Sequence, residues 1–114
     1  MRLIIRDMAH DSIDKIFEYL YNYSPNNAIQ TIDRIYEQIY NLENMPYIGR
    51  YVPKVSNQNV RELIYRKTRN SVYRIVYFIS EITDTVHIIY VANCKQDFNR
   101  ILKLHNYFSN FLKF

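Results

Sequence analysis

The sequence predicts an α+β domain in the order β-α-α-β-β-β-α: a helical hairpin packed on a small, mainly antiparallel sheet, followed by a C-terminal helix. Two patterns carry this prediction. Apolar residues recur every three or four positions through the first half of the chain, as they do in amphipathic helices. Residues 60–92 are instead rich in β-branched and aromatic side chains with short polar interruptions, which is typical of a meander of strands. The length of 114 residues fits one domain spanning residues 1–114.

The N-terminal elements are a strand and a helix. Residues 2–6 (Arg-Leu-Ile-Ile-Arg) have the composition of a short strand. Asp11 or Ser12 is suited to cap the helix that follows, because either side chain can accept a bond from a free backbone N–H. The apolar stripe of this helix predicts that it runs to near Tyr23.

The second helix has the clearest start signal in the chain. Ser24 is a good N-cap, and Pro25 is favoured at the first helical position. We expect Met45-Pro46 to end this helix, because a residue before proline avoids the helical conformation. Since the link between them is short, the two helices should pack as an antiparallel hairpin.

Loop and strand signals follow the hairpin. Residues 46–59 are predicted to be a loop, because they contain glycine, two prolines and several Asn and Ser residues. Strands are predicted at residues 60–67, 71–80 and 85–92, and their short connections indicate an antiparallel meander. Residues 96–112 return to helical periodicity and carry more apolar side chains than one packed face needs. This excess predicts an interaction surface on the last helix.

Alternation along the strand at residues 71–80 separates its two faces. The apolar face, which should pack on the helices, carries Tyr73, Ile75, Tyr77 and Ile79. Arg74 lies on the other face between two valines, where a charge is costly without a partner or a task. Two interpretations stay open: an ion pair with Glu62 on the neighbouring strand, or an arginine presented to a phosphate or carboxylate.

Positive charge is concentrated in the middle of the chain. Residues 1–49 carry four basic and seven acidic side chains, whereas residues 50–74 carry seven basic side chains and one acidic, a balance of +6. Such a block is expected where a polyanion or an acidic protein binds. It is also expected at a sheet edge that is protected against aggregation.

Composition excludes several classes of site. One cysteine, Cys94, rules out an internal disulfide, and one glycine, Gly49, rules out a glycine-rich phosphate loop. No pair of His, Cys or acidic residues has the spacing of a metal site, so we expect no metal and no cofactor. No apolar run reaches the length of a membrane span and no signal-peptide core is found, which predicts a cytoplasmic protein without membrane contact.

Several stretches in a fixed order carry a resemblance to a known family. The most specific are Pro46-x-x-Gly49-Arg50, Arg61-Glu62-Leu63 and Tyr73-Arg74-Ile75-Val76-Tyr77. With these stretches the chain resembles the RelE/ParE superfamily of bacterial type II toxin–antitoxin toxins over nearly its whole length. The long helical hairpin looks more like the ParE branch, whose members inhibit DNA gyrase, than the RelE branch, whose members cut messenger RNA in the ribosome.

The resemblance implies a growth-inhibiting toxin that acts on DNA gyrase. One alternative is a ribosome-dependent mRNA endonuclease of the RelE kind, and another is a degenerate, non-toxic member that only binds antitoxin. Whether the chain is an enzyme depends on the branch, because no nuclease chemistry is expected of a ParE-like inhibitor.

The charge block and the resemblance together indicate a target-binding set: Arg50, Arg61, Arg66, Arg69, Arg74 and Lys95. If the chain is a nuclease, the resemblance implies that Arg61, Arg74 and Lys95 stabilise charge at the scissile phosphate.

The implied partner is a cognate antitoxin, expected to be acidic and partly disordered, while gyrase or the ribosome with its mRNA is the target. The predicted antitoxin contacts lie on the last helix, at Ile101, Leu104, Phe108 and Phe111. A homodimer, or a heterotetramer with antitoxin, is compatible with the same surface.

Overall fold

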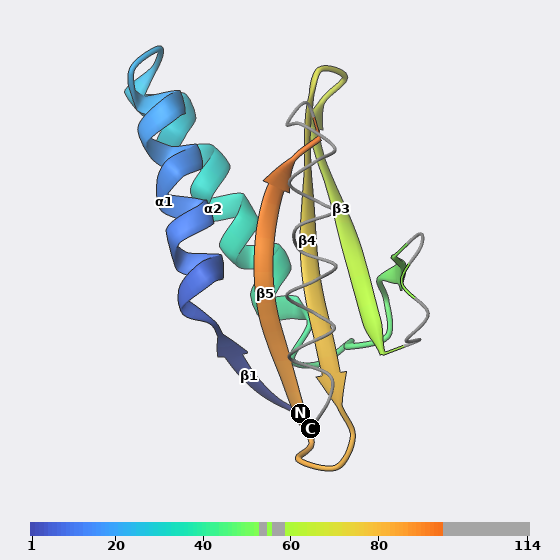
Figure 1. Ribbon diagram of the computed structural model, residues 1–114. Helices are drawn as coiled ribbons and strands as arrows, with labels where there is room; N and C mark the ends of the chain where they lie inside the picture. The colour runs from blue at the N-terminus through green and yellow to red at the C-terminus, as the bar shows by residue number, and fades with distance from the viewer. Residues whose placement is uncertain (53–54, 56–58, 95–114) are drawn as a thin grey trace.

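The computed structural model describes residues 1–52, 55 and 59–94. In these residues a five-stranded sheet carries a hairpin of two helices on one face (Figure 1). The elements in chain order are β1 (Arg2–Ile5), α1 (Asp7–Tyr21), α2 (Pro25–Asn41), β2 (Arg50–Tyr51), β3 (Val60–Thr68), β4 (Ser71–Ser80) and β5 (Thr85–Asn93). The α+β class is as predicted and, apart from β2, so is the order of these elements. The helix expected over residues 96–112 lies outside the described residues.

The strands are arranged in the order β1-β5-β4-β3-β2. The predicted antiparallel meander forms the centre of the sheet, where β4 pairs with β3 on one side and with β5 on the other. β1 pairs in parallel with β5 at one edge. At the other edge, β2 pairs with β3 through Arg50 and Tyr51 only. The expectation of an unbroken loop over residues 46–59 is therefore wrong at β2, because two residues are too few to show a strand pattern.

Helix α1 begins at Asp7, one turn before the predicted caps Asp11 and Ser12. The N-cap is Arg6, whose side chain makes no capping bond. The backbone N–H of Arg6 still donates to the Ile88 carbonyl of β5 at 3.0 Å, so the chain passes directly from strand pairing into the helix. Tertiary pairing, not a local cap, therefore sets the start of α1, and the predicted start was wrong for that reason.

Ser12 has a different task inside α1. Its hydroxyl donates to the Ala9 carbonyl at 2.7 Å and accepts from the backbone N–H of Val91 at 3.0 Å. Both bonds are buried. The serine that looks like a cap in the sequence thus joins α1 to β5.

Helix α2 starts as predicted. Ser24 Oγ accepts from the backbone N–H of Asn27 at 3.3 Å, and Pro25 is the first helical residue. The helix ends at Asn41, earlier than the Met45-Pro46 limit. The N–H groups of the next three residues each donate to the carbonyl three positions earlier, at 3.0–3.2 Å, and these tighter turns stop the helix.

The core lies between the helical hairpin and the sheet. The predicted face of β4 is buried there, as are Ala9, Ile13, Ile16, Ile35 and Ile39 from the helices. A smaller buried cluster forms separately from Val52, Val60, Val76 and Ile89. Neither α1 nor α2 combines the length and the hydropathy that crossing a bilayer needs.

Candidate functional site

Glu62 is the centre of a charge cluster on the sheet face that points away from the helices. Its side chain is 1% exposed, and it stands opposite Arg50 of β2. The carboxylate accepts a bond from Arg50 Nε at 2.7 Å, and its second oxygen lies 3.9 Å from Nη1 of Arg74 on β4. One buried carboxylate thus orients two arginines.

The structure shows one of the two interpretations that the sequence left open for Arg74, the ion pair with Glu62. The ion pair with Glu62 exists, but a separation of 3.9 Å is too long for a strong hydrogen bond. The side chain is 28% exposed, and Nε has no hydrogen-bond partner among the described residues. Nε is itself buried, so a carboxylate or phosphate would have to be bound through the exposed part of the guanidinium.

Arg61 lies on the opposite face of the sheet from Arg74. On β3 it pairs with Tyr77, which packs on the helix side, whereas Arg74 pairs with Ile64 one residue out of phase. Because successive side chains of a strand point to opposite faces, the structure does not bring Arg61 and Arg74 to one point.

Arg61 instead fastens the loop that precedes β2. Its Nη1 donates to the carbonyls of Gly49 at 2.8 Å and of Tyr47 at 3.2 Å. The guanidinium carbon also lies 5.2 Å from the centre of the Tyr47 ring and 4.6 Å from that of Tyr51, which is cation–π distance. The side chain is thus engaged by its own chain.

Tyr77 holds the same loop from the sheet. Its hydroxyl donates to the Pro46 carbonyl at 2.7 Å and accepts from the backbone N–H of Gly49 at 2.9 Å. A Cβ on Gly49 would lie 2.4 Å from that hydroxyl, so glycine is required by close approach. The hydroxyl of Tyr77, whose pKa burial raises above its usual 10.0, is protonated at neutral pH and can donate. The Pro-x-x-Gly-Arg motif is therefore explained by packing.

The other predicted site residues are separated from this cluster or are not described. Arg66 is exposed on β3, on the same face as Arg74 by alternation, and Arg69 is exposed in the β3–β4 turn. Those outside the described residues are Lys95, Ile101, Leu104, Phe108 and Phe111. Their roles stay predictions.

His87 is half-buried on β5 and too far along the sheet to serve Arg74. It pairs with Phe78, which is four residues from Arg74 on β4, or roughly 13 Å at about 3.3 Å per residue. Burial lowers the pKa of His87 below its usual 6.5, and the charges of Arg6 and Arg2 lower it further. Within the described part of the chain, no three His, Cys or acidic side chains gather as metal ligands.

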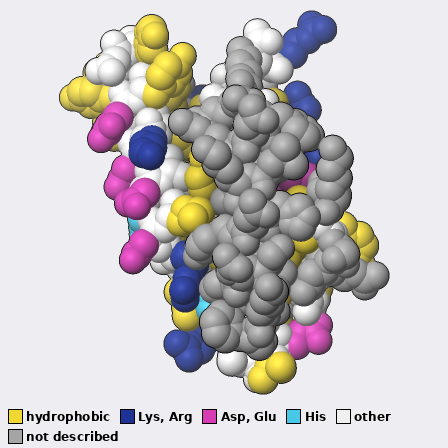
Figure 2. Space-filling view, in the orientation of Figure 1, with side chains coloured by type: hydrophobic (Ala, Val, Ile, Leu, Met, Phe, Trp, Pro, Cys, Tyr) yellow, Lys and Arg dark blue, Asp and Glu magenta, His cyan; other side chains and the backbone are white. Residues whose placement is uncertain are grey.

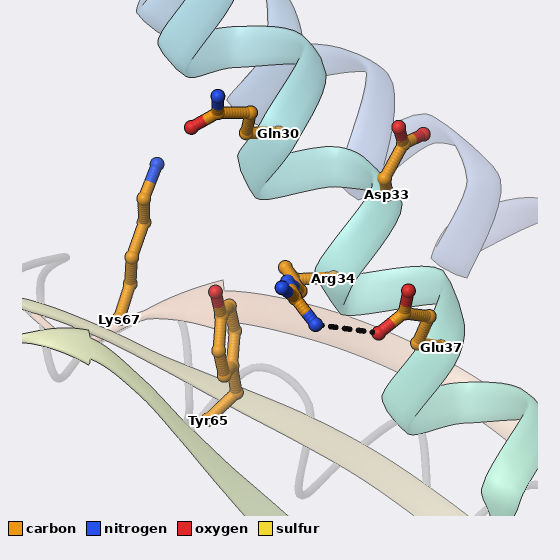
Figure 3. Close-up of a pocket in the computed structure, with 6 residues that line it drawn as sticks. All are labelled: Gln30, Asp33, Arg34, Glu37, Tyr65 and Lys67. Carbon is orange, nitrogen blue, oxygen red and sulfur yellow. Dashed lines mark hydrogen bonds and ion pairs between the residues drawn. The ribbon is translucent and has the colours of Figure 1, made fainter.

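A groove between α2 and β3 has no signature in the sequence (Figure 3). Its volume is about 560 Å³, and its lining is Gln30, Asp33, Arg34, Glu37, Tyr65 and Lys67. Tyr65 and Lys67 point from β3 toward α2, where Arg34 pairs with Glu37 at 3.1 Å. The four lining residues of α2 belong to the polar side of that helix, so only the fold shows that they line a groove.

Lys67 fastens β3 to α2 across this groove. Its Nζ donates to Thr31 Oγ1 at 2.6 Å and to the side-chain oxygen of Asn27. Partial burial lowers the pKa of Lys67 below its usual 10.5. Because these bonds engage the ammonium, Lys67 acts here as a structural contact between β3 and α2.

Comparisons with known proteins agree with this architecture. A family model described as "ParE toxin of type II toxin-antitoxin system, parDE" matches residues 3–98. Among solved structures, the chain resembles one described as "Chromosomal ParDE TA system from P. aeruginosa", with a TM-score of 0.66 and 18% identity, over 82% of this chain and 95% of that one. At that identity the likeness shows the fold alone. No curated protein matched. Since the family match spans most of the sequence, the chain belongs to the ParE toxin family of type II toxin–antitoxin systems.

Proposed function

We propose that the toxin inhibits growth by acting on DNA gyrase in the cytoplasm and that a cognate antitoxin neutralises it. Family membership supplies the toxin role and an antitoxin as partner. That the target is DNA gyrase goes beyond family membership and is the part we propose. The observation that supports it is the separation of Arg61 and Arg74 onto two faces of the sheet, because this argues against the nuclease alternative.

RNA cleavage through a 2′-hydroxyl needs a base, an acid and charge stabilisation within reach of one phosphate. Near Arg74, the acid among the described residues is Glu62, which is buried and bonded to Arg50. The imidazole of His87 lies farther along the sheet by roughly 13 Å. This arrangement suits binding of an anionic group better than proton transfer to it.

In this proposal four arginines bind acidic groups or phosphates of the target: Arg50, Arg66, Arg69 and Arg74. Arg61 supports that surface by holding the loop before β2. Lys95 completes the target-binding set, and the antitoxin contacts are Ile101, Leu104, Phe108 and Phe111.

The test measures two activities of the same purified toxin: inhibition of gyrase supercoiling and cleavage of ribosome-bound mRNA. We expect inhibited supercoiling and intact mRNA. Arg74→Ala should raise the toxin concentration for half-inhibition at least about tenfold, because it removes a partly buried charged donor. Arg34→Ala is the matched control, since Arg34 is an exposed arginine of α2 in a surface ion pair. Cleaved mRNA with unaffected gyrase would establish the nuclease alternative. Inactivity in both assays together with intact antitoxin binding would establish that the chain is a degenerate, non-toxic family member.

A further inference from the structure

The tip of the α1–α2 hairpin exposes a cluster of tyrosines, which we call the tyrosine tip: Tyr19, Tyr21 and Tyr23. They are 59%, 49% and 76% exposed. Their rings are ordered by neighbours, with centroids 5.2 Å apart for Tyr19 and Tyr23 and 5.5 Å apart for Phe17 and Tyr21. In the space-filling view, hydrophobic side chains gather over this end of the hairpin (Figure 2). Exposed, pre-ordered tyrosines are typical of a protein interface, because burying them costs little side-chain entropy.

Negative charge leads up to the tyrosine tip along α1. Asp7, Asp11, Asp14 and Glu18 are spaced by four, three and four residues, so they share one face of the helix with Tyr21. All four carboxylates are exposed, and none forms an ion pair with a described residue. Acidic side chains are visible over α1 in Figure 2. Residues 7–44 carry seven acidic and two basic side chains, a net charge of −5.

The negative charge of α1 indicates which kind of partner can bind the tyrosine tip. Exposed tyrosines can stack on nucleic-acid bases, but a row of carboxylates beside them repels phosphates. A basic protein surface is attracted by the same row, and its apolar hollows can receive the rings. We infer that the tyrosine tip docks on a basic protein surface, guided by the acidic face of α1.

The proposed function, on which this inference rests, supplies a surface of that kind. An enzyme that holds duplex DNA must present basic side chains to its phosphates. The acidic face of α1 is about 16 Å long at 1.5 Å per residue, a length over which duplex DNA carries about ten charges. Four carboxylates are therefore a weaker ligand than DNA for the same surface. The toxin should compete with DNA, and the tyrosines must contribute part of the affinity.

The test measures the Kd of the full-length toxin for gyrase, with and without added linear DNA. Tyr21→Ser/Tyr23→Ser should raise the Kd at least about tenfold, as expected for aromatic anchors of an interface. Asp11→Asn/Asp14→Asn/Glu18→Gln should raise it in low salt and less in high salt. Tyr40→Ser and Asp33→Asn are the matched controls, since both residues are exposed on α2 and neither belongs to the tyrosine tip or to the acidic face of α1. Linear DNA should raise the wild-type Kd.

Three results would overturn the inference, and they are distinguishable. If wild type and tip variants bind and inhibit gyrase equally, the tyrosine tip is not the docking surface, while the proposed function stands. If wild type does not bind gyrase at all, the proposed function fails, and this inference with it. If the tip variants lose antitoxin binding instead, the tip belongs to the antitoxin interface. Unfolding curves of each variant establish that it is folded, and the single Tyr23→Ser variant replaces the pair if the double variant is not.

Discussion

Gly49 has almost no room for an added methyl group. Its Cβ would lie 2.4 Å from the Tyr77 hydroxyl and 2.8 Å from the Glu62 carbonyl, both of which are fixed by the sheet. Gly49→Ala should therefore destabilise the protein by about 1–3 kcal/mol, the usual cost of overpacking, and lower Tm by at least about 4 °C. In a Tyr77→Phe background the alanine should cost less, because one of the close contacts is gone. Equal costs in both backgrounds, measured by thermal unfolding, would show that the hydroxyl is not the obstacle.

Among the charges that the structure describes, Glu62 should be the most sensitive to substitution. Glu62→Gln leaves Arg74 without its counter-charge on a partly buried face, so we expect a loss of about 1–3 kcal/mol in the free energy of unfolding. Glu37→Gln is the matched control, since Glu37 is 59% exposed in a surface pair, and we expect less than about 0.5 kcal/mol there. Equal effects in chemical denaturation would mean that the burial of Glu62 contributes nothing.

The imidazole of His87 should make the free energy of unfolding depend on pH. Burial, together with Arg6 and Arg2, lowers its folded pKa below the unfolded value of 6.5. The unfolded chain then binds the proton more tightly, so the free energy of unfolding should be greatest above about pH 6.5 and fall as the pH drops through the folded pKa. His87→Gln should flatten this fall in denaturation curves from pH 5 to 7.5. If His10→Gln on the surface of α1 flattens it as much, the effect does not belong to His87.

Sequence patterns could predict which residues of β4 face the core, but not the roles of the arginines. Alternation correctly separates the buried Tyr77 from Arg74. It cannot show that Arg61 is held by two carbonyls of a distant loop, because that contact depends on how residues 46–51 fold back. The pairing of Arg74 with Glu62 was one of two open interpretations, and only the register of β3 on β4 decides it.

The two helices differ in what fixes their starts. Ser24 caps α2 locally, and sequence identifies it because the cap and Pro25 are adjacent. Helix α1 begins where β1 stops pairing with β5, and no local pattern encodes that event. The misplaced start of α1 and the unforeseen β2 have the same physical cause, since both are set by contacts between segments far apart in the sequence.

The attachment of α1 to the sheet depends on a single hydroxyl, that of Ser12. Ser12→Ala removes the buried acceptor of the Val91 N–H, so it should cost about 1–3 kcal/mol, the penalty of an unsatisfied buried donor. Ser24→Ala removes only a helix cap and should cost about 1 kcal/mol, while Ser24→Asp should restore stability because aspartate also caps. If Ser12→Ala costs no more than Ser24→Ala in chemical denaturation, the bond to β5 does not carry the attachment.

At the scale of the whole molecule, charge is divided between two regions of opposite sign. The helical hairpin carries −5, whereas residues 50–74 carry +6. The sequence alone shows the basic block. The fold adds that the acids of α1 lie on one exposed face, while Glu62, the one acid of the block, is buried between two of its arginines. A protein with two surfaces of opposite charge can bind groups of both signs, and in our proposal the arginines bind acidic groups or phosphates of the target while the acidic face of α1 binds a basic part of it.

The first strand forms one edge of the sheet and should protect the molecule against aggregation. β1 pairs residues 2–5 with residues 85–88, and the Arg2 N–H donates to the Asp84 carbonyl at 2.9 Å. Its inward side chains, Leu3 and Ile5, pack against the core. Deleting residues 1–5 would uncover both that part of the core and the backbone edge of β5, which is a template for pairing with another chain.

We expect the truncated toxin to lose its cooperative thermal transition and to elute as aggregates in size-exclusion chromatography. Arg2→Ser, an exposed substitution in the same strand, should leave both measurements unchanged. A truncated chain that elutes like the wild type and keeps the wild-type Tm would show that β5 does not need β1 as its edge.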